Sequence, residues 1–589
     1  MSLSPLLSQR DPPGAIGTSR PTCVARNKLD IAAICLLSLG RIAMTWVQNY
    51  DPLQNFVLSA IVAALPVVVL LSAIALFRIR IHFAALLGLG VALAVAIFLY
   101  RMPVRAAAGA TFYGSCYGLF PIGWIILNLI FLYQLTVEKG LFELLRSGLA
   151  RIAPDPRIQV ILIAFSFGAF FEGAAGFGTP VAVTAAILMQ LGFKPLAASG
   201  LSLIANTAPV AFGALGTPII ALKGVTGIDE VTLSKMVGRQ LPFFSLIVPF
   251  WVVWAMSGFR GMLGIWPAAL TAGVCFAVPQ FLVSNFHGPW LVDIVASLCS
   301  MAGLVALLRF WRPREVTNAS ESPMNNALNA PTIGSVPSAR EFQKAWLPWI
   351  LLSVMVFIWG IPRFKALLNG ISSFDFAVPS LHNVVMRAPP VAPVGAPPEK
   401  AIFTLNWLSA TGSGILAAAI LSGLIMGFGL KQLGQRYVRT VYLVRFSLLT
   451  IAAMLALGYV TRYSGTDATL GLALAKTGAL YPFFGTLLGW LGVALTGSDT
   501  ASNVLFGSLQ KITAERTHVS PVLMAAANSS GGVMGRWWTR RASWWRARPR
   551  IGMGTKAIFC ATSFSTALHW RAWSEFSFIC RRMLRRLRA

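Results

Sequence analysis

The chain has 589 residues, of which 56% are hydrophobic and 11% are charged, and its formal net charge is +29. Its mean hydropathy of +0.71 excludes an ordinary soluble protein. We interpret the excess of Lys and Arg as charge flanking membrane helices plus a basic tail, and not as a surface for nucleic acid.

Apolar runs with few charges recur along the chain, and each is about as long as the ~20 residues that a helix needs to cross a bilayer. These runs lie near residues 56–77, 83–100, 119–135, 240–257, 264–283, 290–308, 346–360, 414–430 and 441–460. Together with glycine-broken segments elsewhere in the chain, they predict an all-α polytopic membrane protein with roughly 12–14 transmembrane passages. The seven cysteines form no C-x-x-C pair, so we expect no metal site, and we expect no cofactor.

The first 43 residues differ in composition from the rest of the chain, being rich in Pro, Ser and Arg around a short apolar stretch that Arg41 interrupts. A secretory signal peptide is the alternative, but no small-residue cleavage pattern precedes a soluble domain. We interpret residues 1–43 as a non-native extension. The first transmembrane half is then 44–308, with Met44 as the natural start.

The first acidic residue at predicted membrane depth is Glu172, in the apolar and glycine-rich stretch 167–180. A carboxylate at that depth costs several kcal/mol and marks a functional site. Glycine and proline around it predict a broken helix or a re-entrant turn, which is tolerated only where protein or water covers the backbone. The expected hinge residues are Gly173, Gly176, Gly178 and Pro180.

Two polar stretches divide the chain further. Residues 309–344 are rich in Asn, Ser, Pro and basic residues, which predicts a flexible cytoplasmic linker before the second transmembrane half, 345–535. Residues 361–400 contain a proline-rich run, and we interpret them as an external loop.

The second acidic residue at membrane depth is Asp499, which comes soon after the expected hinge Gly497. Asn206 follows Glu172 by 34 positions, and Asn528 follows Asp499 by 29, so the two halves repeat weakly. Such paired segments are typical of the binding site of a secondary transporter. Amide and hydroxyl groups beside helix breaks are expected to bind substrate, namely those of Asn206, Thr207, Ser498, Thr500, Asn503, Asn528 and Ser529. The structural alternative is that these side chains hold helices together.

Cations also occur at predicted membrane depth. Arg445 is a candidate for binding the substrate carboxylate through its planar guanidinium group. Lys476 is the weaker candidate, because a lysine readily extends to the membrane interface.

Several stretches closely resemble the bacterial L-lactate permease family. They are FGAFFEGAAGFGTPVA (167–182), IANTAPVAFG (204–213), NWLSATG (406–412), TGSDTASNVLFG (496–507) and NSSGGVMG (528–535). The resemblance runs from about Thr45 to Gly535. It implies an inner-membrane carrier that takes up lactate, and often glycolate, together with protons.

The resemblance ends at Gly535. Residues 536–589 contain 13 of the 48 Lys and Arg and 6 of the 18 Trp, with a single acid, Glu575. An excess of Trp and Arg is typical of GC-rich DNA read in a wrong frame, and one permitted set of codons, shifted in frame, encodes an apolar helix like the end of the family. We therefore interpret 536–589 as a frameshifted basic tail, and a genuine amphipathic tail on the membrane surface is the alternative.

The sequence thus predicts a secondary transporter that takes up L-lactate and related monocarboxylates, such as D-lactate or glycolate, across the bacterial cytoplasmic membrane. Glu172 and Asp499 are the expected proton-coupling residues. The expected partners are the substrate, protons and the lipid bilayer, and a homo-oligomer stays open. A sodium-coupled carrier, a channel and an intramembrane enzyme are the alternatives, and the enzyme is disfavoured because only two acids are available to it.

Overall fold

The computed structural model describes residues 45–150, 152, 155–174, 176, 179–313 and 339–535. The expected N-terminal extension 1–43, most of the linker, the expected hinge Gly178 and the basic tail 536–589 lie outside the described residues.

The all-α prediction is confirmed. Ten helices in the described part of the chain are long and apolar enough to cross a membrane, or eleven if one bent pair forms a single span. Two shorter apolar helices, at Pro180–Gln190 and Thr411–Ile425, would have to enter the membrane as well for the expected 12–14 passages to be reached.

The chain before the first acidic segment forms paired helices. Asn55 starts the first of them by accepting a hydrogen bond from the Leu58 N–H at 3.2 Å. The helices of this region are α2 (Phe56–Ala75), α3 (Ile81–Ala94), η1 (Val95–Leu99), α4 (Val104–Tyr117), η2 (Gly118–Gly123), α5 (Trp124–Glu138) and α6 (Leu141–Ala150).

The first acidic segment and the helices after it are interrupted repeatedly. Proline begins several of these helices, where its missing N–H costs nothing. They are α7 (Pro156–Val160), η3 (Ile161–Phe167), α8 (Gly168–Ala174), α9 (Thr179–Gln190), α10 (Pro195–Ala205), η4 (Val210–Phe212), α11 (Gly213–Thr226) and α12 (Glu230–Gln240).

Long helices then close the first half and open the second: α13 (Pro242–Gly264), α14 (Trp266–Phe286), α15 (Val292–Phe310) and α16 (Ala339–Gly360). Because α16 begins at Ala339, it includes the last residues of the expected linker.

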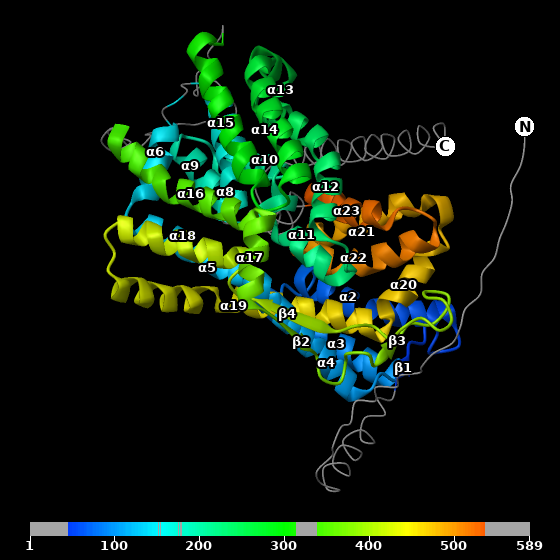
Figure 1. Ribbon diagram of the computed structural model, residues 1–589. Coiled ribbons are helices and arrows are strands. Elements are labelled where there is room, and N and C mark those ends of the chain that lie inside the picture. The colour runs from blue at the N-terminus through cyan, green and yellow to red at the C-terminus, as the bar shows by residue number, and fades with distance from the viewer. Residues whose placement is uncertain are drawn as a thin grey trace, which may run out of the picture. The chain divides into compact units, whose positions relative to one another are not determined.

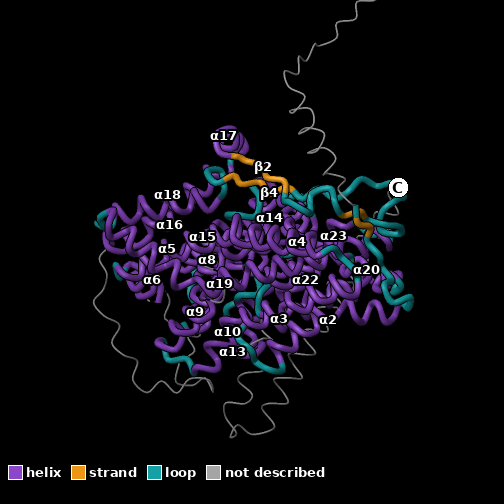
Figure 2. Tube along the Cα trace, turned by 90° about the horizontal axis from the view of Figure 1, so that it is seen from below, coloured by secondary structure: helices purple, strands orange, loops and turns teal. Residues whose placement is uncertain are grey.

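The expected external loop 361–400 is more ordered than its prolines suggest. It contains α17 (Pro362–Ser372) and short strands that pair with neighbours. β1 (Trp46–Val47) runs parallel to β3 (Val385–Met386), and β2 (Ser373–Ala377) runs antiparallel to β4 (Ile402–Asn406). Figure 2 shows β2, β4 and α17 together at one edge of the helices.

The second half repeats the pattern of long and broken helices. It contains α18 (Thr411–Ile425), α19 (Leu430–Ser464), α20 (Thr466–Ala475), η5 (Gly478–Leu480), α21 (Tyr481–Thr496), α22 (Asp499–Arg516), α23 (Pro521–Gly532) and η6 (Val533–Gly535). Figure 1 shows α11 and α12 of the first half beside α22 and α23 of the second, which brings the two acidic segments into one region.

Small residues allow these helices to approach one another closely. A methyl group on Gly114 of α4 would lie 2.6 Å from the Cα atom of Ala456 in α19. Such backbone contact is how membrane helices gain packing energy when lipid is as apolar as the side chains. The segment that ends in α8 is almost completely buried, so Glu172 lies in the protein core and not at the lipid surface.

Candidate functional site

Glu172 lies in the last turn of α8 and is 2% exposed. The Asn206 side chain, at the end of α10, donates a hydrogen bond from Nδ2 to Oε2 of Glu172 at 2.9 Å. A methyl group on Gly213 would lie only 2.7 Å from Oε1 of Glu172, so α11 contacts the carboxyl group through its first residue. Two helices that come after Glu172 in sequence therefore surround its carboxyl group.

The backbone of α11 reverses its handedness where it meets α8. Ala214, Leu215 and Gly216 have φ angles of 45°, 55° and 79°, and the axis bends by 68° between Pro195–Ala205 and Val210–Thr226. Gly176, with φ of 55°, lies in the break after α8, and a methyl group there would come within 2.7 Å of the Ala214 Cβ. The two breaks of the first half are thus packed against each other, and glycine at Gly176 and Gly216 permits the positive φ angles there.

Asp499 is the first residue of α22 and is also 2% exposed. Gly497 ends α21 with φ of 75°, and the Ser498 hydroxyl caps α22 by accepting the Ala501 N–H at 3.3 Å. The N-terminus of a helix carries partial positive charge, which stabilises a carboxylate placed there.

A buried network of hydrogen bonds continues from Asp499. Its Oδ2 accepts from the Ser529 hydroxyl at 2.5 Å and from Asn503 Nδ2 at 3.2 Å. Asn528 donates in turn to Asn503 Oδ1 at 2.9 Å, and Gln510 donates to Asn528 Oδ1 at 3.2 Å. The four side chains beyond Asp499 are all buried, so they fix the position of its carboxyl group from within the protein core.

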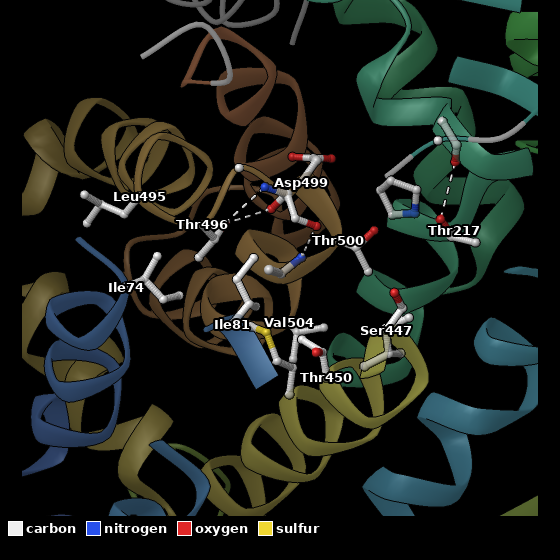
Figure 3. Close-up of a pocket in the computed structure, with 18 of the residues that line it drawn as sticks. Ile74, Ile81, Thr217, Ser447, Thr450, Leu495, Thr496, Asp499, Thr500 and Val504 are labelled. Atoms are coloured by element: carbon white, nitrogen blue, oxygen red, sulfur yellow. Dashed lines mark hydrogen bonds between the residues drawn. The ribbon is translucent and has the colours of Figure 1, made fainter. Parts of the chain in front are cut away.

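Both carboxyl groups line a single cavity of about 930 Å³. Its wall is built by the turn between α2 and α3, by α11, by α19 and by the break between α21 and α22. Figure 3 shows Thr217 of α11, Ser447 and Thr450 of α19, and Asp499 and Thr500 of α22 around this cavity. Hydroxyl groups from three elements thus face the same space as the two acids.

The residues predicted from sequence fall into three groups. Those that line the cavity are Glu172, Gly176, Gly497, Ser498, Asp499 and Thr500. Those that are buried but do not line it are Gly173, Pro180, Asn206, Thr207, Asn503, Asn528 and Ser529. Asn206 and Asn503 reach the site through the carboxyl groups that they bind.

Arg445 forms the third group and is placed differently from the other candidates. Its guanidinium group lies over the rings of Tyr442 and Phe446 on its own helix, 3.5 Å and 4.4 Å from their centroids, and donates to the Tyr442 carbonyl. Phe446 lines the cavity, but Arg445 does not. The cations that do line the cavity are Arg78 and Arg80, both exposed, in the turn between α2 and α3.

The far end of α11 is anchored by cations from the second half. Arg462 Nη1 donates to the carbonyls of Gly224 and Val225, each at 3.4 Å, and Lys511 Nζ donates to the Thr226 carbonyl at 2.9 Å. Positive charge at a helix C-terminus is stabilising. Since α11 also carries Gly213 and Thr217, these bonds fix the orientation of one wall of the site.

Comparison with known proteins agrees with this architecture. The model of the L-lactate permease family matches residues 59–540. The chain belongs to this family. It is 47% identical over 505 residues to the glycolate permease GlcA of Escherichia coli K12, covering 84% of this chain and 90% of that protein.

Other relatives in the family have similar identities. An L-lactate permease of Bacillus subtilis is 46% identical over 516 residues, which is 84% of this chain and 90% of that protein. One of Escherichia coli K12 is 44% identical over 501 residues, 83% of this chain and 90% of that protein. Among solved structures, the YdaH transporter of Alcanivorax borkumensis is only distantly similar, with 14% identity and a TM-score of 0.38 over 78% of this chain and 86% of that chain.

Sequence reasoning missed several residues of this family member's site. Thr217, Ser447 and Thr450 line the cavity, but nothing distinguishes them in sequence from hydroxyl residues elsewhere in the helices. Asp293 is a further buried acid, 1% exposed, in the first turn of α15. The sequence does contain a signal for it, because Asp293 is a carboxylate within the apolar run 290–308, and an acid in such a run marks a candidate site.

Proposed function

We propose that this protein is a secondary transporter that takes up L-lactate and related small monocarboxylates, such as D-lactate or glycolate, with protons across the bacterial cytoplasmic membrane. The observation that carries the proposal is that Glu172 and Asp499, one from each half, line the same cavity. Family membership supports the substrate class, and the names of two relatives, a lactate permease and a glycolate permease, favour a short hydroxy acid.

The cavity suits such a substrate chemically. Lactate and glycolate each have a carboxylate, which needs donors, and a hydroxyl, which can donate and accept. Thr217, Thr450 and Thr500 offer hydroxyls in the cavity, and the exposed Arg78 and Arg80 make its wall attractive to anions. The apolar residues that share the wall, such as Ile81 and Val504, suit the methyl group of lactate.

Proton coupling is proposed from the position of the acids. Glu172 and Asp499 both face the cavity while being only 2% exposed. Removing a carboxylate anion from water costs free energy, and binding a proton or accepting hydrogen bonds from its own network lowers that cost. Binding of the substrate anion and of a proton in one cavity adds no net charge to a site within the membrane, which lowers the cost of moving both across it.

Alternating access would then be a movement of the broken segments. The breaks at Gly176 and Gly497 line the same cavity as the two carboxyl groups. Half-helices that end at such breaks can move against the ordinary helices around a central site. We assign no enzymatic reaction to the protein.

The deciding experiment uses the purified protein in liposomes that contain a pH-sensitive dye. Addition of labelled lactate under an imposed pH gradient should give saturable uptake above the external concentration, together with acidification of the lumen. A protonophore should abolish the accumulation. Uptake driven by a sodium gradient without acidification would support the sodium-coupled alternative, and uptake that only equilibrates would support a channel.

A further inference from the structure

Asp293 of α15 is a buried acid that the proposed site does not yet include. Its side chain is 1% exposed, and neither carboxyl oxygen has a hydrogen-bond partner among the residues that the structure describes. A carboxylate anion without donors in an apolar core costs several kcal/mol. This environment therefore favours the neutral acid, which carries a proton.

Asp293 lies directly behind the Glu172 segment. A methyl group on Gly173, the residue after Glu172, would lie 2.8 Å from the Asp293 Cβ. The backbone of α8 therefore packs directly against the Asp293 side chain. Glu172 directly precedes Gly173, so it belongs to the same turn of α8 that contacts Asp293. Glu172 lines the cavity and Asp293 does not, so the two acids lie at successive depths from the water-accessible space.

Other ionisable groups around α15 are paired with a charge, stacked on an aromatic ring or distant along the helix. This helix packs against α14, α8, η3 and α11. Cys275 of α14 lies beside Gly303 of α15. Gly303 is ten residues beyond Asp293, which is about 15 Å along the helix. Lys223 of α11 is paired with Glu230, and His287 before α15 stacks on Phe357 at 5.2 Å. On α15 itself, Cys299 lies more than a turn beyond Asp293, and Arg309 lies in the last turn. Glu172 is thus the acid that can share a proton with Asp293.

Unpartnered oxygens next to Glu172 support a bound proton at this place. Asn206 uses its amide N–H for Glu172, while its Oδ1 and the Thr207 hydroxyl have no hydrogen-bond partner in the described part of the chain. Both oxygens are buried, and each could accept a hydrogen bond from a protonated carboxyl group.

We propose that Glu172 and Asp293 form a carboxyl pair that holds the transported proton. A water-borne proton from the cavity forms an O–H bond with a carboxylate oxygen of Glu172 and can pass to Asp293. The reverse transfer releases it to water, and no other bond changes. Two neighbouring acids in an apolar core resist being ionised together, so the pair retains one proton. This inference rests on the proposed proton symport and adds the residue that retains the proton in the core.

The test compares four proteins in the same dye-loaded liposomes: wild type, Asp293→Asn, Asp293→Glu and the control Ser297→Ala. Ser297 is buried one turn further along α15 and donates only to the Ile294 carbonyl, so it matches the site without a carboxyl group. Lactate counterflow, which needs no net proton movement, reports whether each protein is folded and binds substrate.

The counterflow rate of Asp293→Asn should stay within about threefold of the wild-type rate. Its proton-driven accumulation of lactate should fall at least about tenfold. The pH profile of uptake should also change, because the variant lacks one of the two acids that hold the proton. Asp293→Glu should restore most of the accumulation, and Ser297→Ala should behave as wild type.

Three outcomes would overturn the inference, and a fourth would concern the function itself. An unshifted pH profile and full proton entry in Asp293→Asn would show that the buried acid is not used. Loss of counterflow in both Asp293→Asn and Asp293→Glu would show a purely structural role. Wild-type uptake could depend on sodium instead of protons. If Asp293→Asn then lost that sodium dependence, the pair would be a cation site. Absence of proton entry and of sodium dependence in the wild type would instead refute the proposed symport.

Discussion

The two halves place their acids in opposite surroundings. Asp499 begins α22, where the helix N-terminus is partially positive, and it accepts hydrogen bonds from Ser529 and Asn503. Glu172 lies near the C-terminal end of the segment that finishes with α8, where the helix is partially negative, and beside the second acid Asp293. The two acids thus differ in the helix end that they occupy and in the side chains around them.

This contrast assigns different tasks to residues that look equivalent in sequence. We propose that Glu172 is the main proton carrier of the two, whereas Asp499 also organises the break between α21 and α22 that borders the cavity. The two halves therefore repeat a geometry while their chemistry differs.

Asp499→Asn should have the largest effect. The amide oxygen of the variant can still accept from Ser529 and Asn503, but without the negative charge, and a hydrogen bond to a charged group contributes roughly 1.5–3 kcal/mol against roughly 0.5–1.5 kcal/mol for a neutral one. Loss of this organisation should reduce both uptake and counterflow roughly 100-fold. Counterflow in liposomes is the measurement, and Asp375→Asn on the exposed strand β2 is the matched control. Counterflow at the wild-type rate would show that the network is not needed for substrate binding.

Glu172→Gln should separate coupling from exchange. The side-chain oxygen of glutamine can still accept from Asn206, so the local fold is expected to persist. Without a titratable group, uphill accumulation and lactate-driven proton entry should be lost, while counterflow should stay within about threefold of wild type. If this variant and Asp499→Asn behaved alike, the functional contrast between the halves would be wrong.

Glycines that touch the two acids offer a subtler comparison. A methyl group would lie 2.6 Å from Asp499 Oδ1 at Gly532, and 2.7 Å from Glu172 Oε1 at Gly213. Gly532→Ala should reduce uptake about tenfold, because Val493 also crowds that position and the Asp499 network is fixed on all sides. Gly213→Ala should cost only about threefold, because Glu172 can turn toward the cavity.

The control for both glycine variants is Gly434→Ala. A methyl group there would meet no other atom within 4 Å, so uptake should not change. Equal losses at Gly213 and Gly532 would indicate that Glu172 is held as rigidly as Asp499.

Much of the fold could be read from the sequence, because membrane spans depend on runs of apolar residues and on length. The breaks at Gly176 and Gly497 could be predicted for a similar reason, since glycine beside a buried acid has few other uses. The pairing of Asn503 with the Pro218 carbonyl across the two halves could not, because that contact depends on how distant helices pack. Asp293 was missed because one acid at the start of a long apolar run looks like a helix end.

Arg445 shows the limit of reasoning from residue type. A cation at membrane depth suggests a carboxylate site, but this guanidinium group lies on aromatic rings of its own helix. Its orientation depends on which face of α19 turns to the cavity, and the apolar sequence around it has no clear periodicity to reveal that face.

The smallest effect is expected at the cavity's exposed cations. Arg78 and Arg80 lie in the turn between α2 and α3, in contact with solvent, so they act on the substrate anion through a screened field and not through a fixed bond. Arg78→Gln combined with Arg80→Gln should raise the apparent KM for lactate about two- to fivefold at low ionic strength and leave kcat unchanged. The difference should vanish at about 1 M salt, where the screening length is only about 3 Å. Arg445→Gln is the matched control, and it should change KM at neither ionic strength because its side chain does not line the cavity. If Arg445→Gln changed KM more than the double variant did, Arg445 would be the residue that binds the substrate carboxylate. The α2–α3 turn would then have no role in attracting the substrate.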